Sequence, residues 1–174
     1  MQAWSTLEFV EQNGELLLYN NRRMQLYRGL DDVRRLIDAV CRERAIAQVW
    51  QPKAGWRGKR FDLRVVVIAG RAQHVLPRLS SHPITNLQLG AERGDPDELR
   101  RDAGEENWHR MLAQCELAAQ AYLDNLYCAF DVLVSPGWRR FAIAEANAFG
   151  DLLHGSIHNG KDPYGAELAC YKQS

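Results

Sequence analysis

The chain has 174 residues, of which 46% are hydrophobic and 25% are charged, and its formal net charge is zero. This composition is typical of a soluble globular protein of one domain or slightly more, and it excludes a disordered tail, a collagen-like repeat and a coiled coil. The neutral total also argues against a general nucleic-acid-binding protein.

The first elements predicted are the strands of a β-hairpin. Asn13 and Gly14 form a turn signal between two apolar stretches, so residues 7–10 and 15–19 are expected to pair across that turn. Residues 24–27 are expected to add a short third strand.

A helix and a buried strand are predicted next. Residues 30–44 carry apolar side chains at helical spacing and two aspartates in the first turn, where the helix dipole favours them. Residues 46–50 are apolar and predict a short buried strand, which Pro52 ends.

The middle of the chain predicts a long hairpin. Residues 61–68 are rich in β-branched side chains, Gly70 turns the chain, and residues 73–80 return as the partner strand. Pro77 within the second strand indicates a sheet edge or a strand end. The polar residues 92–107 predict a surface excursion that holds a helical turn.

The last third predicts a second long helix and a closing hairpin. Apolar residues at helical spacing run through 108–126, and strands are expected at 127–134 and 140–147. A short helix is expected near 164–171. Because most of these strands are joined by hairpins, the sequence predicts an α+β fold with a mainly antiparallel sheet and two long helices.

The four cysteines do not form a redox or zinc motif, because none of them belongs to a CxxC pair. Three of them, Cys41, Cys115 and Cys128, lie in apolar segments, where a free cysteine is expected to be a small buried hydrophobe. No signal peptide is recognised and no apolar run approaches the length of a membrane span. The sequence therefore predicts a reduced, cytoplasmic chain without a membrane partner.

The closing hairpin carries the first candidate site. Asp131 stands within an apolar strand, and Glu145 and Asn147 are two residues apart at the end of the partner strand, so their side chains share a face. Two carboxylates and an amide oxygen placed together suit Mg²⁺. The alternative, left open by the spacing, is that the carboxylates pair with arginines such as Arg64 or Arg139.

The long hairpin carries the second candidate site. Residues 53–78 hold seven Lys/Arg and one acid, and residues 1–80 hold fourteen Lys/Arg against eight Asp/Glu, a balance that reverses in residues 81–174. Arg64 and Arg78 are placed on strands, where a guanidinium is a rigid fork for phosphate or carboxylate oxygens. The alternative is an ordinary basic surface. Together, the two candidate sites predict phosphoryl transfer.

A zinc site is a weak further candidate. His154 and His158 are four residues apart with Asp151 nearby, but Gly155 and Gly160 argue against the helix that would bring the two imidazoles together. No GxxxxGK[ST] or GxGxxG motif is present.

Six short stretches, taken in order, resemble the C-terminal part of an ATP-grasp ligase of the glutathione-synthetase-like or spore-coat-associated type. They are residues 47–53 (AQVWQPK), 61–67 (FDLRVVV), 77–80 (PRLS), 85–90 (TNLQLG), 129–132 (AFDV) and 145–147 (EAN). The resemblance implies ATP and Mg²⁺ as cofactors. It also implies a carboxylate–amine ligase reaction, in which ATP phosphorylates a small carboxylate and an amine then displaces the phosphate.

The resemblance also implies roles for individual residues. Its nucleotide-binding set comprises Gln48, Trp50 and Lys53, from the stretch that would line the adenine, together with Arg64. Its catalytic set, which would face phosphates or the acyl phosphate, comprises Arg64, Arg78 and Asn86. Its metal set comprises Asp131, Glu145 and Asn147.

Such ligases are about twice as long, so the resemblance leads us to expect an N-terminally truncated chain. Residues 1–50 would be a remnant of the ATP-grasp central subdomain and residues 51–174 the C-terminal catalytic-type subdomain. An incomplete ATP cleft would expose apolar surface and favour a homodimer. The competing hypothesis is a non-catalytic binding module that uses the basic hairpin 53–78 for an acidic or nucleic-acid partner.

Overall fold

A computed structural model describes residues 1–122, 124–148, 153 and 155–172. It is an α+β fold whose strands form a two-stranded and a six-stranded sheet, with every strand pairing antiparallel. The strands are β1 (Gln2–Gln12), β2 (Glu15–Arg28), β3 (Gly55–Trp56), β4 (Lys59–Ile68), β5 (Arg71–Ser80), β6 (Glu92–Arg93), β7 (Tyr127–Val134) and β8 (Phe141–Asn147). The helices are α1 (Leu30–Arg42), α2 (Pro96–Ala103), α3 (Glu105–Ala119) and α4 (Pro163–Tyr171).

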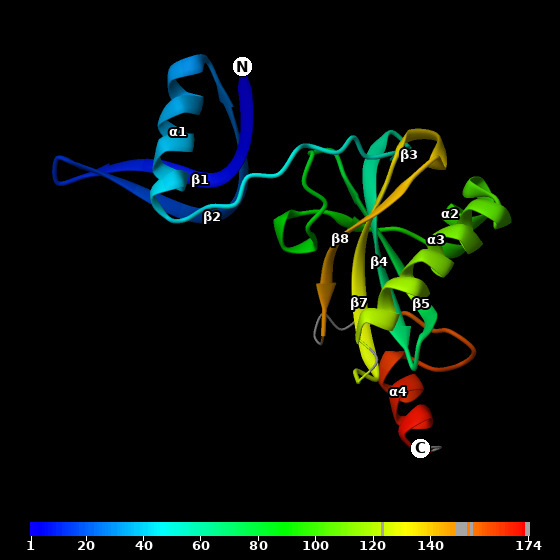
Figure 1. Cartoon of the computed structure of the whole chain (residues 1–174). Helices are drawn as coiled ribbons and strands as arrows, with labels where there is room; N and C mark the ends of the chain where they lie inside the picture. Colours follow the sequence, from blue (N-terminus) through cyan, green and yellow to red (C-terminus); the bar gives the residue numbers. More distant parts are fainter. Residues whose placement is uncertain (123, 149–152, 154, 173–174) are drawn as a thin grey trace.

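The N-terminal hairpin and α1 form a small unit beside the main sheet (Figure 1). Strands β1 and β2 pair from Gln12–Glu15 to Gln2–Arg28 around the predicted turn. The stretch 24–27 is the far half of β2, so the prediction of a separate third strand was wrong. Helix α1 confirms the predicted helix, although its amphipathic pattern buries only Val33 and Leu36, and Cys41 is exposed instead of buried.

The predicted buried strand at 46–50 is absent. These residues form no strand, and the side chains of Ile46 and Val49 are 89% and 84% exposed. The segment instead crosses from α1 to the main sheet as an extended connection (Figure 1). A buried strand needs a neighbouring strand to accept and donate its backbone hydrogen bonds. No strand in the described part of the chain pairs with residues 46–50.

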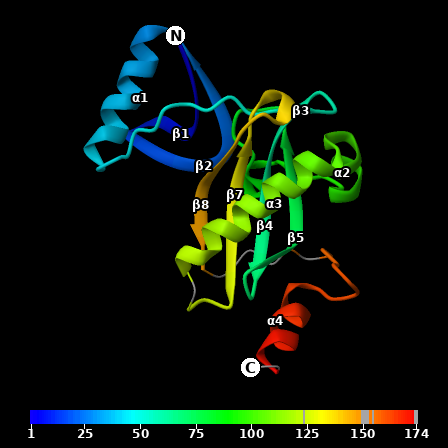
Figure 2. The ribbon, with the colours of Figure 1, turned by 45° about the vertical axis from the view of Figure 1, so that its right-hand side comes forward.

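The main sheet has the order β6-β5-β4-β7-β8, with β3 added on β4. Helices α2 and α3 cover one face, as Figure 2 shows for α3. Alternate residues of β4, namely Phe61, Leu63 and Val65, pack against α3 through Trp108 and Met111. The predicted hairpin of β4 and β5 is confirmed, and α3 ends earlier than the predicted limit of residue 126.

The other residues of β4 point to the opposite face of the sheet. There Val66 and Ile68 form a smaller apolar cluster with Ala166 of α4. Arg64 and Asp62, two and four residues before Val66 on the same face, are buried and charged. This face is therefore apolar near α4 and polar toward the other end of the strands.

A β-bulge divides β8 between the two faces. Asp131 pairs with Glu145, but the next residue of β7, Val132, pairs with Ile143, so Ala144 is an extra residue. Ile143 consequently packs on the α3 side, whereas Glu145 shares the polar face with Asp131. Bulges re-aim side chains in this way.

None of the helices in the described residues is long and apolar enough to span a bilayer.

Candidate functional site

The polar half of the sheet face contains a hollow of about 360 Å³. Its walls come from the neighbouring strands β5, β4, β7 and β8 and from the short 3₁₀ helix η1 (Leu87–Leu89). It is lined by Arg64, Arg78, Asn86, Leu87, Gln88, Asp131, Glu145 and Asn147. The whole predicted metal set and the whole predicted catalytic set therefore line one hollow.

Arg64 and Asp131 face each other across paired positions of β4 and β7. Nε of Arg64 lies 2.5 Å from Oδ1 of Asp131, and its Nη2 donates a 3.3 Å hydrogen bond to Oδ2. Neither Arg64 Nε nor Asp131 Oδ1 has the alignment of a hydrogen bond to any described residue. The contact is therefore mainly a charge contact. It matches the sequence alternative for Asp131, whereas that alternative also paired Glu145 with an arginine, and no such ion pair occurs among the described residues.

Arg78 is held by two carboxylates. Its Nε donates to Oδ1 of Asp62 at 2.8 Å, and its Nη2 lies 3.0 Å from Oδ2 of Asp131. Burial works to lower the pKa of the guanidinium, but hydrogen bonds and charges from Asp62 and Asp131 outweigh it and raise the pKa above its usual value. Arg78 is therefore a fixed, permanently charged fork at the wall of the hollow.

Lys53 joins the same network from the other side of Asp62. Its Nζ lies 3.1 Å from Oδ2 of Asp62 and donates to the hydroxyl of Thr85 at 2.6 Å, and Thr85 in turn contacts Asp62. A second hollow of about 220 Å³ adjoins these groups and shares Arg78, Asn86 and Asp131 with the first. The predicted nucleotide-binding residues Trp50 and Lys53 line this second hollow.

Glu145 and Asn147 are the groups best placed to accept a cation. The side chain of Glu145 is exposed and makes no ion pair or hydrogen bond with the described residues. Asn147 has a buried amide Nδ2 with no hydrogen-bond partner among those residues, and an amide can present either its nitrogen or its oxygen. These oxygen donors suit Mg²⁺, which takes one or two carboxylates and leaves positions for phosphate oxygens, whereas the adjacent Asp131 already contacts Arg64 and Arg78.

Two of the predicted residues are less involved. Asn86 lines both hollows, but its side-chain oxygen caps η1 by accepting from the backbone N–H of Gln88. Gln48 is exposed in the extended connection and lines neither hollow. The sequence-based assignment of Gln48 to the adenine therefore has no support from a nearby cavity.

Asp62 and Thr85 are the site residues that the sequence reasoning missed. Asp62 is buried and contacts both Lys53 and Arg78. A signal for it was present, because Asp62 is the single acid within 53–78 and stands two residues before Arg64 on the same strand face. Thr85 carries no comparable signal, since only the tertiary structure brings it to Asp62.

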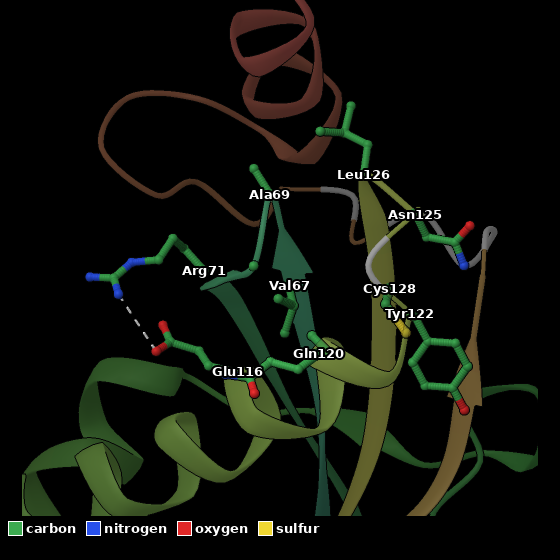
Figure 3. A pocket seen from close by; sticks show the side chains of 11 residues that line it. Val67, Ala69, Arg71, Glu116, Gln120, Tyr122, Asn125, Leu126 and Cys128 are labelled. Atoms are coloured by element: carbon green, nitrogen blue, oxygen red, sulfur yellow. Dashed lines mark ion pairs between the residues drawn. The ribbon is translucent and has the colours of Figure 1, made fainter. Parts of the chain in front are cut away.

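A further hollow, of about 560 Å³, lies at the opposite end of the sheet (Figure 3). Its walls include Val67, Tyr122 and Cys128, and an ion pair of Arg71 and Glu116 with 3.8 Å between the charged atoms stands at its side. Burial raises the pKa of Cys128, which disfavours a reactive thiolate. We call the 360 Å³ hollow and the residues that line it the polar site. The hollow of Figure 3 lacks the clustered arginines and carboxylates of the polar site.

The weak zinc candidate gains no support. Asp151 and His154 lie outside the described residues, and His158 is exposed beside the imidazole of His74, with 5.8 Å between the ring centroids. No group of three or more His, Cys, Asp or Glu side chains that could hold a metal occurs among the residues described.

Comparison of the sequence with models of known protein families gives no match, and comparison with curated proteins gives no significant match.

Proposed function

We propose that the polar site binds Mg-ATP, and that the chain is an ATP-grasp-type domain, part or remnant of a ligase that joins a small carboxylate to an amine through an acyl phosphate. The observation that carries the proposal is the convergence of Arg64, Arg78, Asp131, Glu145 and Asn147 on one hollow. These residues come from the four strands β4, β5, β7 and β8.

The charges of the site favour a polyphosphate with its cation. Lys53, Arg64 and Arg78 contribute three cations whose side chains are 9% exposed, and Asp62, Asp131 and Glu145 contribute three carboxylates, of which Glu145 is the exposed one. The guanidinium groups would attract phosphate oxygens, and the exposed Glu145 at the wall would attract a cation. Phosphoryl transfer depends mainly on such positioning and charge neutralisation.

The chain's residues have definable tasks in that reaction. Arg64 and Arg78 would hold the oxygens of the phosphoryl group as it passes from ATP to the carboxylate, which yields ADP and an acyl phosphate. An amine then attacks the acyl carbon and inorganic phosphate leaves. Asp131, Glu145 and Asn147 would hold Mg²⁺, which would neutralise phosphate charge when bound.

The competing hypothesis, a basic surface for an acidic or nucleic-acid partner, is less favoured by the contacts. Arg57 pairs with Glu98, Lys59 with Glu92, and Arg71 with Glu116. Arg64 and Arg78 are buried against carboxylates. The hairpin therefore presents far less free positive charge than its composition indicates.

Calorimetric titration of the whole chain with ATP, with and without Mg²⁺, tests the proposal. We expect binding that requires Mg²⁺ and that weakens by about tenfold, or about 1.4 kcal/mol, in Glu145→Ala. Glu11→Ala removes an exposed carboxylate of β1 and should leave binding unchanged. Undetectable binding at millimolar ATP, or equal binding by both variants, would overturn the proposal. Binding that ignores Mg²⁺ and falls steeply with salt would support the competing hypothesis.

A further inference from the structure

Asp131 occupies the position between the two arginines of the site. Its two carboxylate oxygens face Arg64 Nε at 2.5 Å and Arg78 Nη2 at 3.0 Å. An incoming phosphate would need the same donors. Asp131 also stands at the paired position beside Glu145 on β8, so one carboxylate lies between the arginine pair and the candidate cation position.

We infer that Asp131 acts as an internal counter-ion that blocks the two arginines until a divalent cation draws its carboxylate toward Glu145 and Asn147. Cation and phosphate then bind cooperatively. The inference rests on the proposed function for the identity of the site, and it adds how binding at that site is regulated.

The cost of binding phosphate alone explains the direction of this coupling. A phosphate that displaced Asp131 would leave a nearly buried carboxylate, 14% exposed, without a cation and next to a new anion. Buried charges without partners are strongly unfavourable. A divalent cation gives that carboxylate a new partner, so it removes most of the cost.

The geometry around Arg64 makes the exchange feasible. Its Nε and Oδ1 of Asp131 are close but not aligned as a hydrogen bond, and the hydrogen bond from Nη2 is long at 3.3 Å. The 2.8 Å hydrogen bond from Arg78 Nε to Asp62 does not involve Asp131, so it does not depend on the position of the Asp131 carboxylate. Asp131 can therefore leave without releasing the orientation of Arg78.

The test is an NMR titration with inorganic phosphate that follows the Nε–H signals of Arg64 and Arg78. Phosphate is the probe because it associates only weakly with Mg²⁺ in water. In the wild-type chain we expect Mg²⁺ to raise phosphate affinity by about tenfold or more, within the usual range of coupling between two sites. By reciprocity, phosphate should raise Mg²⁺ affinity by the same factor. Equal phosphate affinity with and without Mg²⁺ would overturn the inference.

Two variants separate the role of Asp131 from that of a simple metal ligand. Asp131→Asn should bind phosphate without Mg²⁺ more tightly than wild type, and the effect of Mg²⁺ should largely disappear. Glu145→Gln should weaken the effect of Mg²⁺ without raising metal-free phosphate affinity. If Asp131→Asn binds metal-free phosphate no better than wild type, the inference fails. If that variant does not fold, the two wild-type titrations still decide.

The outcomes also distinguish this inference from the proposed function. Mg-ATP binding with uncoupled phosphate would overturn the counter-ion role alone. Coupled binding of phosphate and Mg²⁺ without ATP binding would overturn the nucleotide assignment alone.

Discussion

At the scale of single residues, the buried charged groups of the main sheet are paired with opposite charges. Asp62, Arg64 and Arg78 are each less than 9% exposed, yet all have charged partners. Cys115 is also buried, and burial raises the pKa of its thiol to about 12, with a smaller contribution from Glu116. A thiol that stays protonated has no role as a nucleophile, so Cys115 serves packing.

His74 is a fully buried histidine whose surroundings disfavour the charged imidazolium. Its Nδ1 lies 3.3 Å from the hydroxyl of Ser156, and its Nε2 has no partner among the described residues. Burial lowers its pKa, and the nearby His158 lowers it further, against a smaller opposite effect from Asp162. The folded protein therefore resists protonation of His74.

We expect this residue to make the protein less stable in mild acid. The unfolded chain takes up a proton at His74 near pH 6.5, whereas the folded chain does so at a lower pH. The contribution to stability is therefore complete above about pH 6.5 and is lost as the pH falls toward the lower folded value. Urea unfolding at pH 7.5 and 5.5 should show a smaller pH effect in His74→Gln than in wild type. His109→Gln changes an exposed position of α3 and should lose as much stability between pH 7.5 and 5.5 as the wild type. An equal loss of stability in all three proteins would contradict the prediction.

At the scale of elements, close contact between β5 and the segment after β6 fixes one edge of the main sheet. The backbone N–H of Gly94 donates to the carbonyl of Pro77 at 2.8 Å. A Cβ atom at Gly94 would lie 2.5 Å from Cδ1 of Leu79 and 3.0 Å from Cβ of Pro77. Pro77 therefore lies in the strand next to the edge, where its outer neighbour is the two-residue β6, and its carbonyl has a partner in Gly94.

Gly94→Ala is therefore expected to destabilise the fold by about 1–3 kcal/mol through overpacking. Gly55→Ala is the matched control, because a Cβ there meets only a backbone oxygen at 3.6 Å, an ordinary contact. Denaturant unfolding of the two variants measures the difference. Equal stability of both would show that the edge adjusts without cost.

At the scale of the whole molecule, the chain consists of a small hairpin–helix unit and a larger sheet with helices, joined by an exposed connection (Figure 1). The two units touch at least at Trp4 and His82, whose ring centroids are 4.7 Å apart. Apolar side chains such as Ile46 and Val49 are open to solvent on the connection. The expected homodimer, which sedimentation analysis would reveal, remains a prediction.

Limited proteolysis should find the connection first. Arg44 lies at the start of an exposed stretch without helix or strand, whereas Arg64 and Arg78 are buried in strands. We expect brief trypsin treatment to cut after Arg42 or Arg44 and to leave a fragment that contains the main sheet, because proteases need locally open backbone. Mass spectrometry of the fragments identifies the cut. A first cut after Arg64 would contradict the arrangement.

The sequence by itself determined the α+β class and the antiparallel hairpins, and it selected most residues that line the hollow between β5, β4, β7 and β8, but not Asp62 and Thr85 beside it. Local signals sufficed for these, because β-branched runs, turn residues and charges placed within strands act over a few positions. Residues 46–50 show the limit: their apolar run resembles a buried strand, but a strand also requires a neighbour to pair with, and that is not a local property.

Only the tertiary structure decided which side chains of the site contact one another. The sequence Phe141 to Asn147 alternates so regularly that it places Ile143 and Glu145 on one face, and the bulge at Ala144 separates them. Likewise, the chain order does not reveal that Asp131 contacts both Arg64 and Arg78, or that Thr85 reaches Asp62. Register and long-range pairing arise from packing of the whole sheet, because that packing selects one among several local patterns of similar energy.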